Sequence, residues 1–497
     1  MSVLSGVRRL FKHSMVYGMG HILNRMIVFL LIPLYTNTFS QDLLGVYTLI
    51  FSYIAILTII YSYGLDTAFF RFYIIEDDTA TRNRVFSTAF ITLFVTSLFF
   101  SLLIHLFRAP IAQRLFSPDI HRLGLDLNSL ITWSVAILFF DSLTLMPFLI
   151  LRAEEKPGWF ILFKFINVCL NFGLNTFFIV RLKMGLEAIF IGNFWASALT
   201  MVIMLPICLK HFRFTFSRPT LRDLLKFGLP YLPATLSVNL MDTLDKIVLE
   251  KLDSVEAVGL YGPSAKLGMF MALFIAAFRF AWHPFFLSTV KQPDAKEIFK
   301  KVLTYLLLAC SIVFLFFSLF IDDIVRLKIG RMTILGEEYW PGTVVVPIIF
   351  LAYIAFAAYL NFIIGIYLEK KTGWLPLITG AGIVTNVIAL YTLIPLLGFV
   401  GAAWARVIAY VVMAIVQYFV NHRLYAVHYE WGRIVKMALA VAVCFFLGRS
   451  SLAAGHFLLR AAIFLSFPLL LSLLRFYEKN ERELVRAVLR RLSGRLA

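Results

Sequence analysis

Apolar segments long enough to cross a lipid bilayer recur along this whole chain, and they constrain its fold more than any other feature. A membrane-spanning helix needs about 20 residues. The 497 residues are 61% hydrophobic, yet the chain carries a formal charge of +18, and most Lys and Arg residues fall in short connectors. This pattern predicts an all-α polytopic membrane protein. Basic residues scattered in this way indicate contact with anionic lipids and argue against nucleic acid as a partner.

Apolar length and helix-breaking residues predict about fourteen transmembrane helices. The first follows a basic segment and lacks a small-residue cleavage site after it, so we expect a helix rather than a signal peptide. With both termini in the cytoplasm, the inner segments carry most of the basic residues, which indicates a cell-membrane protein with an even number of helices. The expected limits are 14–34, 44–64, 86–106, 128–150, 159–180, 187–207, 228–249, 259–287, 301–321, 342–364, 374–394, 397–420, 434–449 and 456–474.

A short motif occurs twice, after the first and after the seventh predicted helix. Asp42-Leu-Leu-Gly45-Val-Tyr47 is echoed 214 residues later by Glu256-Ala-Val-Gly259-Leu-Tyr261. Six predicted helices separate the copies, so both have the same orientation in the membrane. Parallel repeats of this kind predict two pseudo-symmetric lobes with a substrate site between them. Chance similarity of short motifs is the alternative. The expected divisions are two six-helix lobes at 1–213 and 214–425, two additional helices at 426–477, and a basic amphipathic cytoplasmic tail at 478–497.

The first helix of each predicted lobe carries a polar stripe. Arg25 lies in the middle of the first span, where a charged residue costs roughly 2.5–3.5 kcal/mol, and His21 lies on the same helical face. In the seventh span Asn239, Asp242 and Lys246 form a similar stripe. The 214-residue offset makes Asn239 the residue equivalent to Arg25 in the second repeat. We expect both stripes to line a central cavity. One alternative is hydrogen bonding that only joins helices, and another is mutual neutralisation of Asp242 and Lys246 at i, i+4.

Further charged residues lie inside predicted spans. Lys266 and Arg279 share the eighth span, and Lys164 lies in the fifth beside a row of asparagines. We expect all three cations to line the substrate cavity. Intramembrane charges of this kind mark substrate paths, proton sites or internal ion pairs. Arg406 is a candidate partner of Asp242 or Asp245, in either a structural or an ion-coupling role. The candidates for coupling or ion pairing are Asp242, Asp245, Lys246, Arg406 and Asp141.

The sequence shows no motif for covalent chemistry. It has no glycine-rich phosphate loop, no nucleophile elbow and no metal-ligand spacing, and its four cysteines are isolated in or beside apolar segments. Its connectors of about 20 residues or fewer leave no room for a separate catalytic domain. We therefore expect a transporter without a cofactor rather than an enzyme such as a ligase or glycosyltransferase.

Several segments together resemble the polysaccharide flippases, the Wzx-like members of the superfamily that includes the lipid II flippase MurJ and the MATE exporters. The similarity covers about residues 8–425. Lys246 stands where the family more often has arginine, so a bidentate phosphate contact is not expected there. The segments that carry the resemblance are Tyr17 to Arg25, Leu31 to Thr36, Asp42 to Tyr47, Phe227 to Pro233, Leu244 to Ile247 and Ala277 to Phe285.

The resemblance implies two lobes around a cavity that opens alternately to each side of the membrane. The implied substrate is a polyprenyl-pyrophosphate-linked oligosaccharide, moved outward for O-antigen, lipopolysaccharide or another cell-surface polysaccharide. Glycosyltransferases and a polysaccharide polymerase are the implied protein partners. A lipid II flippase and a cation-coupled small-molecule exporter are the alternatives, and the deep arginines favour an anionic substrate over the exporter.

Overall fold

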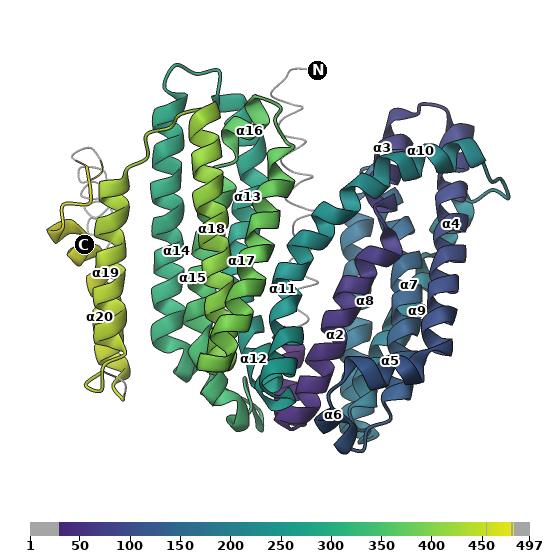
Figure 1. Ribbon diagram of the computed structural model, residues 1–497, viewed down its shortest axis with the longest axis horizontal. Coiled ribbons are helices and arrows are strands. Elements are labelled where there is room, and N and C mark those ends of the chain that lie inside the picture. Colours follow the sequence, from purple (N-terminus) through teal and green to yellow (C-terminus); the bar gives the residue numbers. More distant parts are fainter. Residues whose placement is uncertain (1–28, 454, 479–480, 482–497) are drawn as a thin grey trace, which may run out of the picture.

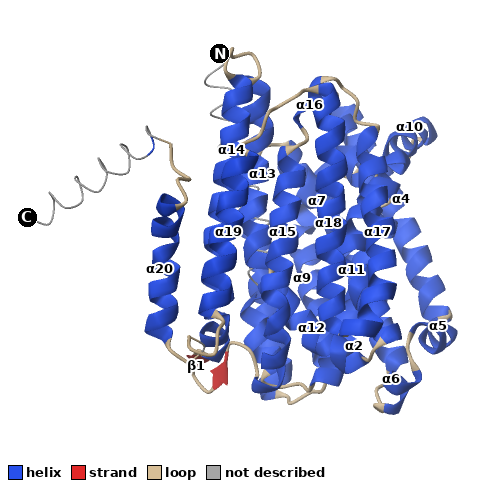
Figure 2. Cartoon of the chain, turned by 60° about the vertical axis from the view of Figure 1, so that its left-hand side comes forward, coloured by secondary structure: helices blue, strands red, loops and turns tan. Residues whose placement is uncertain are grey.

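The computed structural model describes residues 29–453, 455–478 and 481, and these residues are mostly helical. Figure 1 shows long helices running side by side in two groups, with α2 and α11 next to each other where the groups meet. Figure 2 shows α10 and α16 at one side of the bundle and α6 and β1 at the opposite side. We call these the α10 side and the α6 side.

The first group comprises the helices before residue 212. Residues 29–36 are helical and form the described end of the first predicted span. The remaining elements are α2 (Gln41–Ser62), α3 (Leu65–Ile75), α4 (Thr79–Leu106), α5 (Arg108–Leu115), α6 (Pro118–Arg122), α7 (Leu127–Ala153), α8 (Pro157–Thr176), the π-helical turn η1 (Phe177–Arg181) and α9 (Glu187–His211).

The second group begins with a short helix that lies across the bundle. Its elements are α10 (Arg218–Gly228), the 3-10 turn η2 (Leu229–Tyr231), α11 (Leu232–Leu252), α12 (Val255–Leu267), α13 (Met269–Thr289), α14 (Ala295–Arg326), the antiparallel strands β1 (Lys328–Ile329) and β2 (Met332–Thr333), the 3-10 helix η3 (Glu337–Val344), α15 (Val345–Asn361), α16 (Ile364–Leu368), α17 (Trp374–Leu397) and α18 (Phe399–Leu424).

Two further helices, α19 (Trp431–Gly448) and α20 (Phe457–Leu473), pack against each other and against α14. Arg460 of α20 donates to Asp323 of α14 at 2.9 Å, and Thr304 Oγ1 of α14 donates to Glu430, just before α19, at 2.7 Å. These polar contacts lie near the two ends of the helices, while apolar side chains fill the space between. The pair is therefore attached to the second group at both ends.

Within the described residues, ten helical segments are long and apolar enough to cross a membrane, or eleven when α12 and the first part of α13 count as one bent span. α11, the shorter α20 and residues 29–36 lie where the seventh, fourteenth and first spans are predicted. The all-α polytopic fold is thus confirmed, and the number fourteen stays a prediction. Large apolar side chains such as Phe99 and Phe446 are exposed on the outside, as lipid-facing residues would be.

Several predicted limits are wrong for one physical reason. Hydropathy measures the apolar part of a helix, whereas backbone hydrogen bonding continues into the polar layers on either side. The span predicted at 301–321 therefore extends over all of α14, and the loops predicted near 107–127 and 208–227 contain α5, α6 and α10. The helix predicted at 259–287 is bent by 41° at Gly268. A Cβ at that glycine would meet Ile349 Cγ2 at 2.4 Å, so its lack of a side chain permits close packing there.

Candidate functional site

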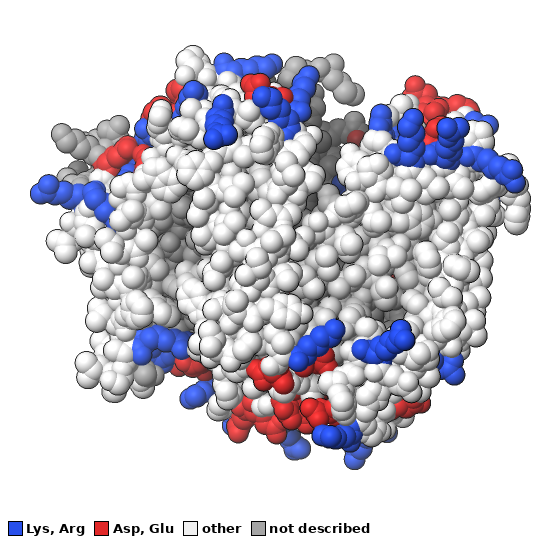
Figure 3. Space-filling view, in the orientation of Figure 1, with Lys and Arg blue, Asp and Glu red and all other residues white. Residues whose placement is uncertain are grey.

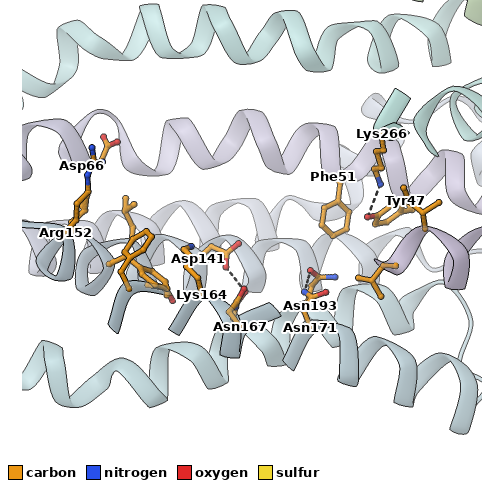
Figure 4. Close-up of a pocket in the computed structure, with 18 of the residues that line it drawn as sticks. Tyr47, Phe51, Asp66, Asp141, Arg152, Lys164, Asn167, Asn171, Asn193 and Lys266 are labelled. Atoms are coloured by element: carbon orange, nitrogen blue, oxygen red, sulfur yellow. Dashed lines mark hydrogen bonds between the residues drawn. The ribbon is translucent and has the colours of Figure 1, made fainter. Parts of the chain in front are cut away.

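A cavity of about 660 Å³ lies among helices of the first group, and Lys266 of the second group also lines it. Its volume falls in the range of small-molecule sites, roughly 300–1,000 Å³. The cavity is elongated: Figure 4 shows Asp66 and Arg152 at one end and Lys266 and Tyr47 at the other. The lining residues are Leu31, Ile32, Tyr35, Tyr47, Phe51, Asp66, Asp141, Thr144, Leu145, Phe148, Leu149, Arg152, Phe160, Lys164, Asn167, Asn171, Asn193, Ser197 and Lys266.

A row of polar side chains on α8 and α9 forms the middle of the cavity wall. Asn167 and Asn171 lie four residues apart and share one face of α8, and the helical repeat brings that face against α9. Asn171 Nδ2 donates to Asn193 Oδ1 at 2.6 Å, and Asn167 Nδ2 donates to Thr200 Oγ1 at 2.9 Å. The amides of this row therefore join the two helices and also line the cavity.

The network continues to the first helix through a fully buried amide. Asn175 Nδ2 donates to the Asn171 carbonyl at 2.7 Å, and its Oδ1 accepts from the Tyr35 hydroxyl at 2.9 Å. Gly192 allows this contact, because a Cβ there would meet Asn175 Nδ2 at 2.9 Å. Three helices are thus connected by polar side chains beside the cavity, which holds the amides of Asn171 and Asn193 in fixed positions.

Asp141 and Lys164 face the cavity from neighbouring helices. Asp141 is exposed to the cavity and accepts a hydrogen bond from Ser197 Oγ at 2.5 Å. Lys164 is half-buried, and its Nζ lies 4.0 Å from the ring centroid of Phe148. An aromatic face stabilises a cation there. The predicted residues Asp141 and Lys164 therefore both reach the cavity, one as an acceptor and the other as a donor.

Each end of the cavity carries a cation, and the end with Arg152 also carries Asp66 (Figure 4). Lys266 Nζ donates to the Tyr47 hydroxyl at 3.3 Å and lies 4.5 Å from the centroid of that ring. At the other end Arg152 is exposed, with its guanidinium 4.8 Å from the Phe70 ring. The cavity lining carries three cations and two carboxylates. With its amides, hydroxyls and aromatic rings, such a lining suits the hydroxyl groups of sugars and a phosphate group.

A second polar cluster lies in the second group, between α11, α12 and α18. Asp245 is fully buried, ion-pairs with Arg406, and accepts from the Tyr261 hydroxyl at 2.6 Å and from Lys246 Nζ at 2.9 Å. Arg406 is 4% exposed and also lies 3.9 Å from Asp242 Oδ1. The structure therefore places Arg406 between both predicted aspartates. Its role in ion coupling stays a prediction.

Among the described residues the structure places no ion pair between Asp242 and Lys246, so it does not support the alternative that the two neutralise each other. Lys246 Nζ donates to the backbone carbonyl of Asp242 and to the carboxylate of Asp245, while the Asp242 carboxylate accepts from the Tyr410 hydroxyl at 3.2 Å. Lys246 thus pairs with Asp245 on its own helix, whereas Asp242 lies beside Tyr410 and Arg406 of α18, whose positions depend on tertiary packing.

The other predicted site residues divide into two sets. Arg25 and His21 lie outside the described residues. Arg279 is exposed on α13 and Asn239 is half-buried on α11, and neither belongs to the cavity lining found among the described residues.

The lining residues that the sequence does not predict include Tyr47, Phe51 and Arg152. The only signal for Tyr47 is its place in the repeated motif. Arg152 lies just beyond the fourth predicted span, where the sequence predicts a connector. The criterion of charged residues inside apolar segments therefore does not identify aromatic lining residues or lining residues at helix ends.

The two copies of the repeated motif pack against each other at the α6 side. A Cβ at Gly45 would lie 2.0 Å from the Val255 carbonyl oxygen, and a Cβ at Gly259 would lie 1.9 Å from the Gln41 carbonyl oxygen. The offset of 214 converts one contact into the other. Such reciprocity is the geometry of a two-fold axis, in which residue i contacts j and the equivalent of j contacts the equivalent of i.

Hydrogen bonds between the two groups gather at the same side. Gly336 N donates to Thr36 Oγ1 at 2.9 Å, the Tyr339 hydroxyl donates to the Phe39 carbonyl at 2.8 Å, and Ser117 N donates to Glu250 Oε1 at 2.9 Å. Figure 1 shows the two groups converging at α2 and α12 and diverging toward α10 and α16. The groups are therefore joined at the α6 side.

Solved structures with this arrangement of helices are membrane flippases and transporters. The lipid II flippase MurJ in an inward closed conformation has a TM-score of 0.75 at 15% identity, over 95% of this chain and 100% of that chain. An inward-facing multidrug resistance MATE family transporter of the MOP superfamily has a TM-score of 0.62 at 16% identity, over 82% and 95%. The MATE transporter VcmN of Vibrio cholerae, in a bent form, has a TM-score of 0.52 at 11% identity, over 84% and 96%. The chain thus has the same polytopic fold as these proteins.

The sequence itself identifies the family. The family described as "Polysaccharide biosynthesis protein" matches residues 10–290, which is more than half of the chain. The chain therefore belongs to the polysaccharide biosynthesis protein family, and the resemblance to the Wzx-like flippases is confirmed. No protein among the curated sequences matches it.

Proposed function

We propose that this protein is a flippase for a polyprenyl-pyrophosphate-linked oligosaccharide, which it moves from the cytoplasmic to the outer leaflet for cell-surface polysaccharide biosynthesis. One observation carries the proposal: the cavity combines a cation at each end with a row of amides and hydroxyls inside an apolar bundle (Figure 4). Sugars offer many hydroxyl groups to such a wall, and the aromatic rings of Phe51 and Tyr47 offer apolar faces. A diphosphate is stabilised by charge-assisted hydrogen bonds where water is scarce.

Transport by alternating access is supported by how the two groups meet. Apart from α10, which packs on α3 and α4, the contacts between the groups gather at the α6 side. Separating those contacts and closing the α10 side would expose the cavity to the opposite side of the membrane. The two copies of the repeated motif form a nearly symmetric contact between α2 and α12, and a rocking movement of the two groups can begin there. The polyprenyl tail stays in the bilayer throughout, because its transfer into the polar cavity would be unfavourable.

The distribution of charge supports a cytoplasmic α10 side. Figure 3 shows a broad band of uncharged surface, with Lys and Arg predominating at the α10 side and Asp and Glu gathered at the opposite side near α12 and α6. Positive connectors remain on the cytoplasmic side of a membrane. Both termini are then cytoplasmic, and the protein resides in the cell (inner) membrane as a multi-pass protein of O-antigen or lipopolysaccharide assembly.

The membrane potential favours outward movement of the diphosphate. An inside-negative potential contributes about 2.3 kcal/mol per negative charge per 100 mV. Arg406 already neutralises the buried Asp245 and lies near Asp242, so a coupling cation at this cluster would compete with a resident guanidinium. Transport driven by the potential alone is therefore part of the proposal, with ion coupling through Asp242, Asp245 or Asp141 as its alternative.

A lipid II flippase is the second candidate, since the likeness to MurJ covers nearly the whole chain. A MATE-like small-molecule exporter is less well supported, because three cations line the cavity. Glycosyltransferases and a polysaccharide polymerase are the partners that would make and consume a polyprenyl-linked oligosaccharide.

The test is flipping of a labelled polyprenyl-pyrophosphate oligosaccharide in proteoliposomes, read as protection from a soluble glycosidase. We expect Lys164→Gln or Lys266→Gln to lower the rate roughly tenfold to a hundredfold, since a hydrogen bond to a charged group contributes about 1.5–3 kcal/mol. We expect Arg25→Ala to abolish flipping while membrane insertion persists, because removing an intramembrane charge eases insertion.

Lys183→Gln is the matched control, since Lys183 is an exposed cation in the connector before α9. Near-normal flipping by both cavity-lysine variants would remove this cavity from the substrate path. Equal flipping of lipid II would favour the second candidate.

A further inference from the structure

The linker between the two lobes forms a helix with its own exposed groove. α10 lies across the ends of the long helices at the α10 side in both Figure 1 and Figure 2. A groove of about 580 Å³ runs along one face of this helix and continues past its end. This groove is separate from the substrate cavity and shares none of its lining residues.

The groove combines a row of cations with a row of leucines. Arg218, Arg222 and Lys226 are spaced at i, i+4 and i+8, so they share one helical face, and all three are at least partly exposed. None of them forms an ion pair within 4 Å with a carboxylate in the part of the chain that the structure describes. The groove is lined by Arg218, Leu221, Arg222, Leu225, Lys226, Leu229 and Pro230.

The surroundings of the groove suit the interface of a bilayer. Phe214 is 97% exposed just before α10, and Tyr231 is 45% exposed just after it. Amphipathic aromatic side chains concentrate at the headgroup level of membranes. The opposite face of the helix is anchored, since Leu224 is fully buried. α10 is thus a surface helix whose cations and leucines remain open to the headgroup layer.

α10 is also joined to the first lobe at a bend in its central helix. Gly228 contacts Gly64, where a Cβ on either glycine would approach the other's carbonyl oxygen to 2.1 or 2.7 Å. Gly64 has a φ of 78° and separates α2 from α3. Arg71 of α3 lies 4.3 Å from the ring centroid of Phe227. Movement of α10 at the interface would therefore be transmitted to the bend between α2 and α3.

We propose that the α10 groove is a binding site for anionic phospholipid, with the lipid phosphate on Arg218, Arg222 and Lys226 and an acyl chain along Leu221, Leu225 and Leu229. Charge complementarity supports this occupant, since the anionic headgroups of the cytoplasmic leaflet attract basic interfacial segments. The site anchors the linker at the membrane surface, and the Gly228–Gly64 contact connects that anchor to the first lobe. The proposal depends on the cytoplasmic assignment of the α10 side and not on which saccharide is flipped.

The test measures lipid retained by the purified full-length protein. The protein is equilibrated in mixed micelles of phosphatidylglycerol and phosphatidylcholine, and bound lipid is counted by native mass spectrometry. Wild type should retain phosphatidylglycerol in excess. The triple variant Arg218→Gln, Arg222→Gln, Lys226→Gln should lose about a hundredfold in apparent affinity, because each basic residue near the surface contributes about 1 kcal/mol. Its circular dichroism should be unchanged, since none of the three side chains is buried.

The matched control removes three cations from connectors on the same side of the second lobe, as Lys291→Gln, Lys370→Gln and Lys371→Gln. It should retain phosphatidylglycerol as wild type does. The proposal is overturned if wild type binds both lipids equally, or if the control loses as much as the triple variant, which would indicate a nonspecific charge effect. Displacement of phosphatidylglycerol by a polyprenyl diphosphate at equal concentration, lost in the triple variant, would assign the groove to the substrate instead.

Discussion

The reciprocal glycine contact between the two groups of helices predicts how substitution would change which side of the protein is open. In Gly259→Ala, the new Cβ would lie 1.9 Å from the Gln41 carbonyl oxygen, whereas real Cβ contacts stay beyond 3.0 Å. α2 and α12 must therefore separate by about 1 Å. No flexible side-chain end can yield there, because the obstacle is backbone.

That separation raises the free energy of the state in which the two groups are joined at the α6 side, and it does not affect the state open at that side. Overpacking of this kind costs about 1–3 kcal/mol, which shifts a two-state equilibrium roughly 5- to 150-fold. We expect Gly259→Ala to populate the state open at the α6 side by a factor in this range. Gly45→Ala should act in the same direction, since it meets the Val255 carbonyl oxygen at 2.0 Å. The double variant should populate the open state by less than the product of the two single fold-changes. The separation of α2 and α12 caused by the first alanine already reduces the steric clash of the second.

The assay is the rate at which an impermeant maleimide, added outside intact cells, labels Leu31→Cys in the cavity. The background lacks the exposed Cys169. Gly173→Ala is the control, since no heavy atom would lie within 4 Å of a Cβ added at this glycine of α8. It should leave labelling unchanged and stabilise the helix slightly. If Gly259→Ala labels at the control rate with unchanged thermal stability, the close approach of the motifs does not hold the α6 side together.

Two further perturbations test the buried ion pair and the orientation. Asp245→Asn should impair flipping more than Asp141→Asn does. It should also lower the free energy of unfolding by about 3–5 kcal/mol, because Arg406 is left buried without its counter-ion, and adding Arg406→Met should restore stability. If Asp245→Asn is fully stable and transports normally under every imposed gradient, the residue is dispensable for coupling. Phe214→Cys should resist labelling by an impermeant reagent outside intact cells, since its exposed side chain lies on the α10 side; strong labelling would reverse the assigned topology.

The cavity illustrates how far helical periodicity can lead. The stripe of asparagines on α8 and the charges at Asp141 and Lys164 are recognisable in the sequence, because polar residues are costly inside a membrane and stand out against an apolar background. Tyr47 and Arg152 give no such signal. An aromatic ring is ordinary in an apolar helix, and an arginine just beyond an apolar run looks like part of a connector.

The sequence by itself determined the class of fold, the approximate positions of the spans and the duplicated motif. The reason is that each segment's insertion into a bilayer depends on its own hydropathy and on the charges beside it. The helix limits were less accurate, since hydrogen bonding continues where hydropathy stops. Only the tertiary structure decided that Lys246 pairs with Asp245 rather than Asp242, that the two motifs meet through Gly45 and Gly259, and that Lys266 but not Arg279 reaches the cavity. Those outcomes depend on how each helix is rotated, bent and packed against its neighbours. Contacts of this kind produce no periodic pattern in the sequence from which they could be predicted.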